Sequence, residues 1–177
     1  MEGTHIGRWL PLLAVVILTI SFDDVNADYT NLRSKRDLME LGNMIGSVTG
    51  KSLFSVYNSY NGYGCFCGVG GKGKPVDAVD RCCQQHDRCF GAAQRGVCAN
   101  SKASVYNQAY KYTTKATKSH SNGVYATVKC NPLSSYDDMA QGLCARALCN
   151  CDSVLSTCFA QHPYNSKYAG YDRTKCK

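Results

Sequence analysis

The chain has 177 residues and a formal net charge of +7. All 12 cysteines follow residue 64, and an even cysteine number in an exported chain indicates six disulfides formed in an oxidising compartment. Oxidised thiols argue against a zinc site, and scattered basic charge on an exported chain argues against nucleic acid as a partner. An anionic membrane surface remains as a partner for this charge; the alternative is an ordinary solvated basic surface.

The N-terminus has the features of a secretory signal peptide. Arg8 precedes an apolar run from Trp9 to Ile20 that is too short to span a bilayer. The small-residue pattern Val25-Asn26-Ala27 follows this run. We therefore expect residues 1–27 to be a signal peptide and the protein to be secreted and extracellular; the alternative is a signal anchor.

A polar segment over residues 28–36 ends in the dibasic pair Lys35-Arg36. We expect this segment to be a propeptide removed after Arg36, although dibasic pairs also occur on solvated surfaces. The mature chain would then cover residues 37–177, which is the length of one domain.

The first expected helix begins the mature chain. Its apolar residues recur at helical spacing and share one face: Leu38, Leu41, Met44 and Ile45. The helix ends around Gly46 to Gly50. Either this face packs on the core, or the start of the helix, which carries Leu38 and Met39, borders a lipid-binding surface.

The remaining elements indicate a mostly α fold. In chain order we expect a loop over 58–75, a helix over about 77–93, a helix end or β-ribbon around 106–114, a hairpin strand over 124–128, a helix over about 139–161 and a loop tail over 163–177. Pro75 and Gly96 bound the first of the two long helices, and the 58–75 loop is rich in Gly, Asn and Tyr.

Cysteine spacing relates the two long helices to each other. Cys82 and Cys89 are seven residues apart, as are Cys151 and Cys158, so each pair lies on one helix face two turns apart. Two antiparallel helices could therefore be joined by Cys82–Cys158 and Cys89–Cys151. Cys83 points about 100° away from its neighbour and needs a different partner.

His86 is the candidate general base. It lies between the expected braces, beside Asp87 and opposite Asp152 on the other helix, and a carboxylate that binds one ring nitrogen leaves the other free to take a proton from water. The alternatives are a buried structural histidine or a zinc ligand in Cys83-x-x-His86-x-x-Cys89.

Asp87 is the candidate ligand of a hard cation. Calcium takes six to eight oxygen ligands, so one carboxylate needs help from backbone carbonyls and water. Phe66, Gly68 and Gly70 alternate along a glycine-rich loop, so their carbonyls can converge, and glycine permits the positive φ angles of such a turn. The alternative is a tight turn without an ion.

Three motifs in this order carry a family resemblance: Tyr63-Gly-Cys-Phe-Cys-Gly-Val-Gly-Gly71, Asp80-Arg-Cys-Cys-Gln-Gln-His-Asp-Arg-Cys89 and Cys149-Asn-Cys-Asp152. Together they resemble the secreted phospholipase A2 family over essentially the whole mature chain. The run from Cys158-Phe-Ala160 to Pro163-Tyr-Asn165 resembles the group I branch, which contains pancreatic and elapid-venom enzymes.

The resemblance implies a mostly α fold in which a disulfide-braced antiparallel helix pair is accompanied by an N-terminal helix, a calcium-binding loop and a small β-wing. It implies Ca2+ as cofactor, bound by the carbonyl oxygens of Phe66, Gly68 and Gly70 and by the Asp87 carboxylate. It also implies six disulfides: Cys65–Cys176, Cys67–Cys83, Cys82–Cys158, Cys89–Cys151, Cys98–Cys144 and Cys130–Cys149.

The same resemblance implies the reaction. His86 would activate water with Asp152 behind it, Tyr110 would support Asp152, and calcium with the Gly68 N–H would stabilise the oxyanion. We expect hydrolysis of the sn-2 acyl ester of glycerophospholipids, with the protein bound peripherally to a membrane or micelle. The rivals are a toxin-like or receptor-binding member of the same scaffold and a cysteine-rich inhibitor or structural module.

The chain departs from the family pattern at several positions. The seventh group I bridge is missing, because the segments around Thr49 and Thr114 hold no cysteine, and Arg88 stands where group II has one. Phe90 replaces a tyrosine that usually binds the catalytic aspartate. The segment between Cys98 and Cys130 also looks longer than in the pancreatic form.

Processing of the leader can be tested directly. N-terminal sequencing of the secreted protein should begin at Asp37, because removal of residues 28–36 frees the start of the first helix to dock. A stable and fully active product that begins at Asp28 would contradict the propeptide.

Overall fold

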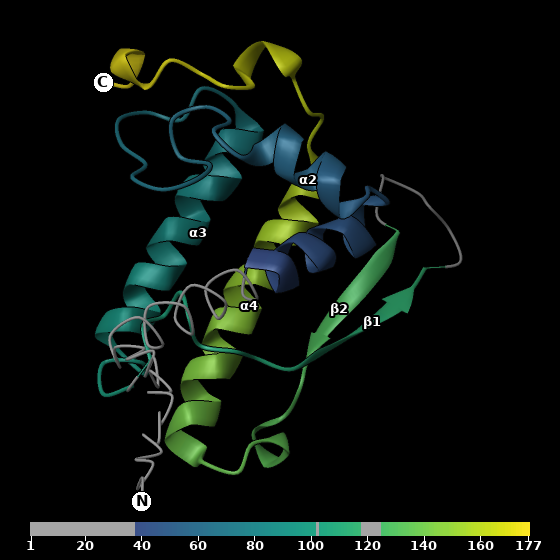
Figure 1. The fold of residues 1–177 in the computed structure, drawn as a ribbon, viewed down its shortest axis with the longest axis vertical. Coiled ribbons are helices and arrows are strands. Elements are labelled where there is room, and N and C mark those ends of the chain that lie inside the picture. The colour runs from purple at the N-terminus through teal and green to yellow at the C-terminus, as the bar shows by residue number, and fades with distance from the viewer. Residues whose placement is uncertain (1–37, 102, 118–124) are drawn as a thin grey trace, which may run out of the picture.

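The computed structural model describes residues 38–101, 103–117 and 125–177, and it confirms a mostly α fold with a small β-wing (Figure 1). The predicted signal peptide and propeptide lie outside the described residues. The principal elements are a helix over 38–49, α2 (Leu53–Tyr60), α3 (Ala78–Arg95), β1 (Tyr112–Ala116), β2 (Ala126–Cys130) and α4 (Met139–Gln161). No helix in these described ranges is both long and apolar enough to cross a membrane.

Helices α3 and α4 lie side by side and form the centre of the molecule (Figure 1). The disulfides Cys82–Cys158 and Cys89–Cys151 join them at two places, and the opposite order of the residue numbers makes the pair antiparallel. Each helix begins at an aspartate whose carboxylate accepts a backbone N–H of the first turn, Asp77 for α3 and Asp138 for α4. These caps match the starts that the sequence indicates.

Helix α2 was not expected. The prediction of loop from residue 58 is wrong for residues 58–60, which belong to this helix. Its signals are present in the sequence: Ser52 caps the helix by accepting the Ser55 N–H at 3.2 Å, and the buried residues Val56 and Tyr60 are four apart. The abundance of Asn, Ser and Tyr concealed this pattern.

The N-terminal helix buries only part of the expected face. Met44, Ile45 and Val48 are buried, whereas Leu38 is 67% exposed and Met39 is 52% exposed. Leu38 therefore does not belong to the core. The exposed start of the helix agrees with the second reading of this element, in which Leu38 and Met39 border a surface.

The β-wing is a single antiparallel hairpin of β1 and β2, with Tyr112 opposite Cys130 and Ala116 opposite Ala126. The second strand begins two residues later than predicted, and residue 124 lies outside the described ranges. The Cys130–Cys149 disulfide attaches the end of this hairpin to α4. The alternative of a helix end around residues 106–114 is wrong, because β1 begins at Tyr112.

The tail after α4 is not wholly irregular. It contains two short 3-10 helices, η3 (Ser166–Tyr168) and η4 (Arg173–Lys175), the second of which ends beside Cys176. The disulfides of the structure are the six pairs that the resemblance implies, including Cys65–Cys176, Cys67–Cys83 and Cys98–Cys144. The first of these ties the tail to the loop before α3.

A buried carboxylate attaches this loop to α3. Asp80, in the first turn of α3, is 0% exposed. Its oxygens accept the backbone N–H groups of Cys65 at 2.8 Å, Phe66 at 2.7 Å and Val76 at 2.9 Å. Three donors offset the cost of burying the charge, so Asp80 fixes both ends of the loop against the helix that carries His86.

Two neighbouring glycines provide a test of this attachment. Gly62 and Gly64 both have positive φ, of 76° and 58°, but a β-carbon at Gly64 would lie 2.3 Å from the Asp80 Cγ, whereas one at Gly62 would meet nothing within 4 Å. Gly62→Ala should cost about 1–2 kcal/mol of stability from backbone strain alone. Gly64→Ala should cost roughly 3 kcal/mol or more, because Asp80 must also move from its donors.

Denaturant unfolding with the disulfides intact measures both costs. Equal losses in the two variants would show that the Asp80 contacts contribute nothing beyond the backbone conformation.

Candidate active site and metal-binding loop

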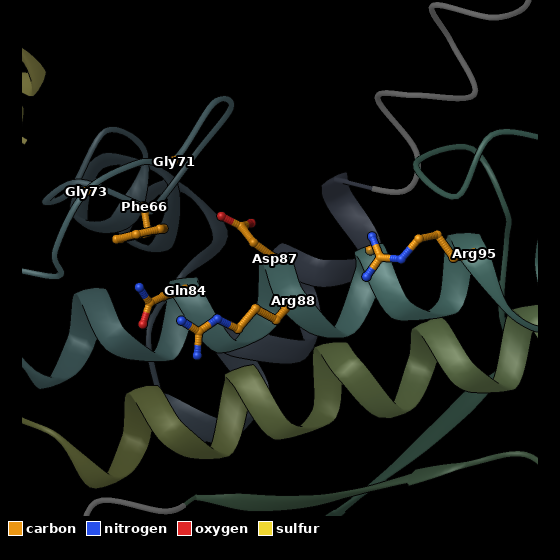
Figure 2. Close-up of a pocket in the computed structure, with 8 residues that line it drawn as sticks. Phe66, Gly71, Gly73, Gln84, Asp87, Arg88 and Arg95 are labelled. Atoms are coloured by element: carbon orange, nitrogen blue, oxygen red, sulfur yellow. The ribbon is translucent and has the colours of Figure 1, made fainter. Parts of the chain in front are cut away.

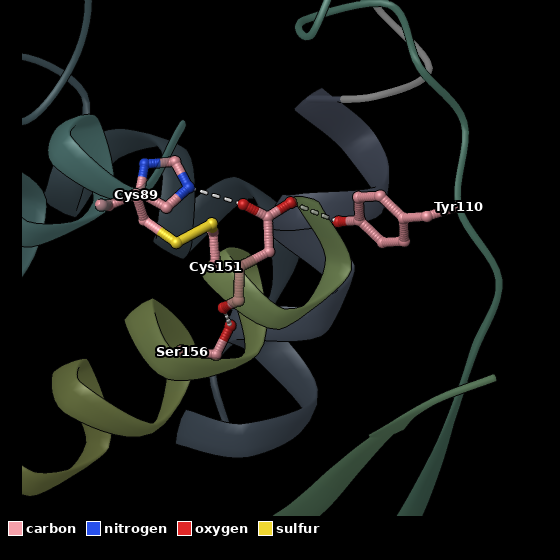
Figure 3. A network of polar contacts seen from close by, with 6 residues as sticks. Cys89, Tyr110, Cys151 and Ser156 are labelled. Atoms are coloured by element: carbon pink, nitrogen blue, oxygen red, sulfur yellow. Dashed lines mark hydrogen bonds and ion pairs between the residues drawn. A yellow bond between two sulfur atoms is a disulfide. The ribbon is translucent and has the colours of Figure 1, made fainter. Parts of the chain in front are cut away.

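The centre of the site is a histidine–carboxylate pair between α3 and α4. The His86 Nε2 lies 2.6 Å from the Asp152 Oδ1, and the two side chains are 15% and 3% exposed. The Cys89–Cys151 disulfide joins the helices next to this pair, and Figure 3 shows the bridge beside the dashed contacts. The structure thus brings together two residues that are 66 positions apart in the sequence.

The second oxygen of Asp152 is bound by Tyr110. The tyrosine hydroxyl donates to Oδ2 at 2.5 Å, and it reaches Asp152 from the side opposite the disulfide (Figure 3). Burial raises the pKa of Tyr110, and the neighbouring Asp152 charge and hydrogen bond raise it further, so the phenol remains a donor. Both carboxylate oxygens of Asp152 therefore have a partner.

Phe90 packs against the His86 ring. Its ring centroid is 4.4 Å from that of His86, and Phe90 is buried. This side chain limits the movement of the imidazole by packing and offers no hydroxyl to Asp152. Within the described residues, the carboxylate of Asp152 is bonded only by the side chains of His86 and Tyr110.

The loop before α3 presents two alternating sets of backbone carbonyls. The carbonyls of Cys65, Cys67 and Val69 accept protein donors: the Lys72 N–H at 3.3 Å for Cys65, the Gly62 N–H at 3.0 Å for Cys67, and the Arg173 guanidinium for Cys67 and Val69. The intervening carbonyls of Phe66, Gly68 and Gly70 accept no donor from the part of the chain that the structure describes.

Unpaired carbonyls of this kind are the oxygen ligands that calcium prefers, and the donor set of three carbonyls and one carboxylate fits this ion. The Asp87 carboxylate points from α3 toward Gly71 of the loop (Figure 2), and a β-carbon at Gly71 would lie 2.8 Å from the Asp87 Oδ2. Although Asp87 as a residue is exposed, the loop covers its carboxylate in part.

This partial burial raises the pKa of Asp87, with a smaller upward effect from Asp80, while His86 and Arg173 act in the opposite direction. A pocket of about 460 Å³ lies beside this carboxylate, between the loop and the outer face of α3, where Arg88 and Arg95 also line it (Figure 2).

A second group of metal-ligand side chains does not form a site. Cys82, Cys158 and His162 approach one another, but the two cysteines form a disulfide and have no thiolate to offer. His86 likewise has no free thiol beside it, because Cys83 and Cys89 are both in disulfides. The alternative of a zinc ligand in Cys83-x-x-His86-x-x-Cys89 is therefore wrong.

Comparison with known proteins agrees with this geometry. A family model described as phospholipase A2 matches residues 38–169. The chain is 39% identical to acidic phospholipase A2 PLA-1 of Eristicophis macmahoni over 142 residues, which are 79% of this chain and 95% of the relative. It is 36% identical to a phospholipase A2 of Oryctolagus cuniculus over 64% of this chain and 69% of the relative.

A third relative covers almost the whole length of both chains. Phospholipase A2 A2-hormotoxin-Apt1a of Adamsia palliata is 31% identical over 169 residues, which are 93% of each chain.

The chain belongs to the phospholipase A2 family. Membership supports a hydrolase reaction of the general kind that the family name denotes, at a lipid interface. In this phospholipase A2 chain, the predicted residues His86 and Asp152 lie in contact, and Tyr110 reaches the same carboxylate. Two further residues were missed by sequence reasoning. Asp80 lies inside one of the three motifs, but its role in anchoring the loop becomes evident only in the folded structure. No local sequence signal marks Arg173.

Tyr110 can be tested against a matched neighbour. Tyr110→Phe removes a 2.5 Å bond and leaves a buried carboxylate oxygen without that donor, so it should lower the free energy of unfolding by about 1–3 kcal/mol. Tyr112→Phe removes only a 3.4 Å contact to the Glu40 carbonyl and should cost less than about 1 kcal/mol. Denaturant unfolding compares the two, and equal losses would show that the Asp152 contact is not the source of the stability.

Proposed function

We propose that this chain is a secreted, calcium-dependent phospholipase A2. It hydrolyses the sn-2 acyl ester of glycerophospholipids to a lysophospholipid and a free fatty acid. One observation carries this proposal: the His86–Asp152 pair stands next to Asp87 and a loop with three carbonyls that accept no donor from the described part of the chain. A base and an oxygen-ligand cation site side by side are the requirements of metal-assisted ester hydrolysis.

His86 acts as the general base. Because its Nε2 lies 2.6 Å from an Asp152 oxygen, that nitrogen carries the proton and Nδ1 keeps its lone pair. Nδ1 takes a proton from water as the oxygen attacks the ester carbonyl, and Asp152 stabilises the imidazolium that results. Tyr110 keeps the carboxylate in place during this change of charge.

Asp87 and the carbonyls of Phe66, Gly68 and Gly70 would hold calcium. The ion, when bound, supplies positive charge beside the ester carbonyl oxygen and lowers the energy of the tetrahedral transition state. The Gly68 N–H donates to no protein acceptor in the described ranges, so it is available to the same oxygen. The positive charge of the ion and the Gly68 N–H would both act on the carbonyl oxygen, where negative charge develops.

Exposed apolar side chains favour peripheral contact with a phospholipid membrane or micelle. Leu38 and Met39 begin the N-terminal helix, and Val69 at the tip of the loop is 97% exposed. Phe54 on α2 is 76% exposed and was not foreseen for this role. Apolar side chains inserted at the interface and cationic side chains near anionic headgroups together supply such binding.

The alternative is a toxin-like or receptor-binding protein with little or no catalysis, since relatives named as toxins match along most of the chain. Retention of His86, Asp87 and Asp152 favours the enzyme, because a binding module does not require this combination. Six disulfides fit the oxidising environment of a secreted protein.

Release of fatty acid from mixed phosphatidylcholine and phosphatidylglycerol vesicles tests the function. Activity should require calcium and disappear with excess chelator. His86→Gln keeps a polar side chain but removes the base, so it should lower the rate by roughly 100-fold or more. His162→Gln, at the exposed end of α4, is the matched control and should keep the wild-type rate.

Asp87→Lys should abolish both calcium binding and hydrolysis, because an ammonium then occupies the ion position. Undiminished hydrolysis in chelator, or by His86→Gln, would refute this mechanism. Tight vesicle binding without any hydrolysis by the wild type would instead support the non-catalytic alternative.

A further inference from the structure

The C-terminal tail places a guanidinium directly on the metal-binding loop. The Arg173 Nη2 donates to the Cys67 carbonyl at 2.8 Å, and Nη1 donates to the Val69 carbonyl. These partners are more than 100 residues away in sequence. Arginine can make both bonds at once because its donors form a rigid planar fork.

The position of Arg173 is fixed by the backbone around it. The Gly64 N–H donates to the Tyr168 carbonyl at 2.9 Å, and the Tyr171 N–H donates to the Gly62 carbonyl at 3.1 Å. Three residues after Arg173, Cys176 forms a disulfide with Cys65 in the loop. The tail therefore follows the loop on both sides of the guanidinium, and Figure 1 shows the tail near the start of α3, on the same side of the molecule as the loop.

We propose that Arg173 is a positioning residue that sets the calcium affinity of this loop, an inference that rests on the proposed function. It binds the carbonyls of Cys67 and Val69, which alternate with those of Phe66, Gly68 and Gly70. Because neighbouring peptide units share the same short turn, fixing one set of carbonyls restricts the directions available to the other set. The guanidinium thereby preorganises the ligands before the ion arrives.

Glycine content explains why this loop needs such a restraint. Positions 68, 70, 71 and 73 are all glycine, and glycine loses more conformational freedom on ordering than any other residue. Without a restraint, that loss would accompany every binding event and weaken the affinity. With Arg173 bound to the loop, this conformational freedom is lost when the protein folds and not when the ion binds.

The charge of Arg173 opposes calcium binding, whereas the bonds from Arg173 to the loop favour it. A guanidinium close enough to influence Asp87 repels a divalent cation, so a purely electrostatic role would predict tighter binding once the charge is removed. Preorganisation predicts weaker calcium binding once Arg173 is replaced. The sign of the change therefore separates the two effects.

Calorimetric titration of the disulfide-intact mature chain with calcium chloride provides the test. Arg173→Gln should raise the calcium dissociation constant by about 10-fold or more, the usual loss when a residue that supports metal ligands is removed. Arg173→Lys keeps the charge but offers a point donor in place of the fork, so it should also weaken binding, by a smaller factor. Lys175→Gln is the matched control, because Lys175 is exposed and pairs only with Asp172 in the described tail.

Lys175→Gln removes the same charge from the same turn and should change the constant by less than about twofold, as expected for an exposed pair. Hydrogen exchange of loop amides 66–71 in calcium-free protein is a second readout and should be faster in Arg173→Gln.

Unchanged or tighter calcium binding by Arg173→Gln would overturn the inference while leaving the enzyme assignment intact. Failure of the wild type to bind calcium would instead refute the proposed function. Should Arg173→Gln not fold, Arg173→Lys decides: weaker binding than in Lys175→Gln supports the role, and equal binding refutes it.

Discussion

The cross-linked antiparallel pair of α3 and α4 is the constraint on which the site depends. Cys82–Cys158 and Cys89–Cys151 fix the axial register of the two helices, because a slip of one turn would separate both pairs of sulfurs by several ångströms. With the register fixed, the His86 Nε2 and the Asp152 Oδ1 meet at 2.6 Å. Covalent bonds thus supply the precision that a small apolar core would supply with difficulty.

The glycine-rich loop before α3 has no regular structure and is instead held from two directions. Asp80 accepts backbone N–H groups at its two ends, and Arg173 donates to carbonyls in its middle. A buried carboxylate and a guanidinium are costly unless every polar atom finds a partner, and here the loop backbone provides the partners. The same bonds leave three carbonyls without donors from the described residues, which is the feature that an oxygen-ligand ion requires.

The surroundings of Asp152 show how the chain accommodates Phe90 at a position where the family resemblance predicts a tyrosine. Phe90 cannot bind the carboxylate, yet both oxygens of Asp152 are occupied, by His86 and by Tyr110. The aromatic ring at position 90 still restrains the imidazole by contact. A phenylalanine at this position therefore leaves neither carboxylate oxygen of Asp152 unsatisfied; a buried acceptor without a partner would be costly in a protein interior.

The sequence by itself determined the elements whose signals are local. Pro75 and Gly96 bounded α3, and the predicted ranges of α3 and α4 agree with the structure to within two residues. Cysteines seven apart placed His86 and Asp152 between two braces. It missed α2, whose weak apolar pattern lies among polar residues. Only the tertiary structure decided that Leu38 is exposed, that Asp80 anchors the loop and that Arg173 reaches Cys67. Those contacts join segments far apart in the chain, and their geometry follows from the folded backbone, which local spacing does not encode.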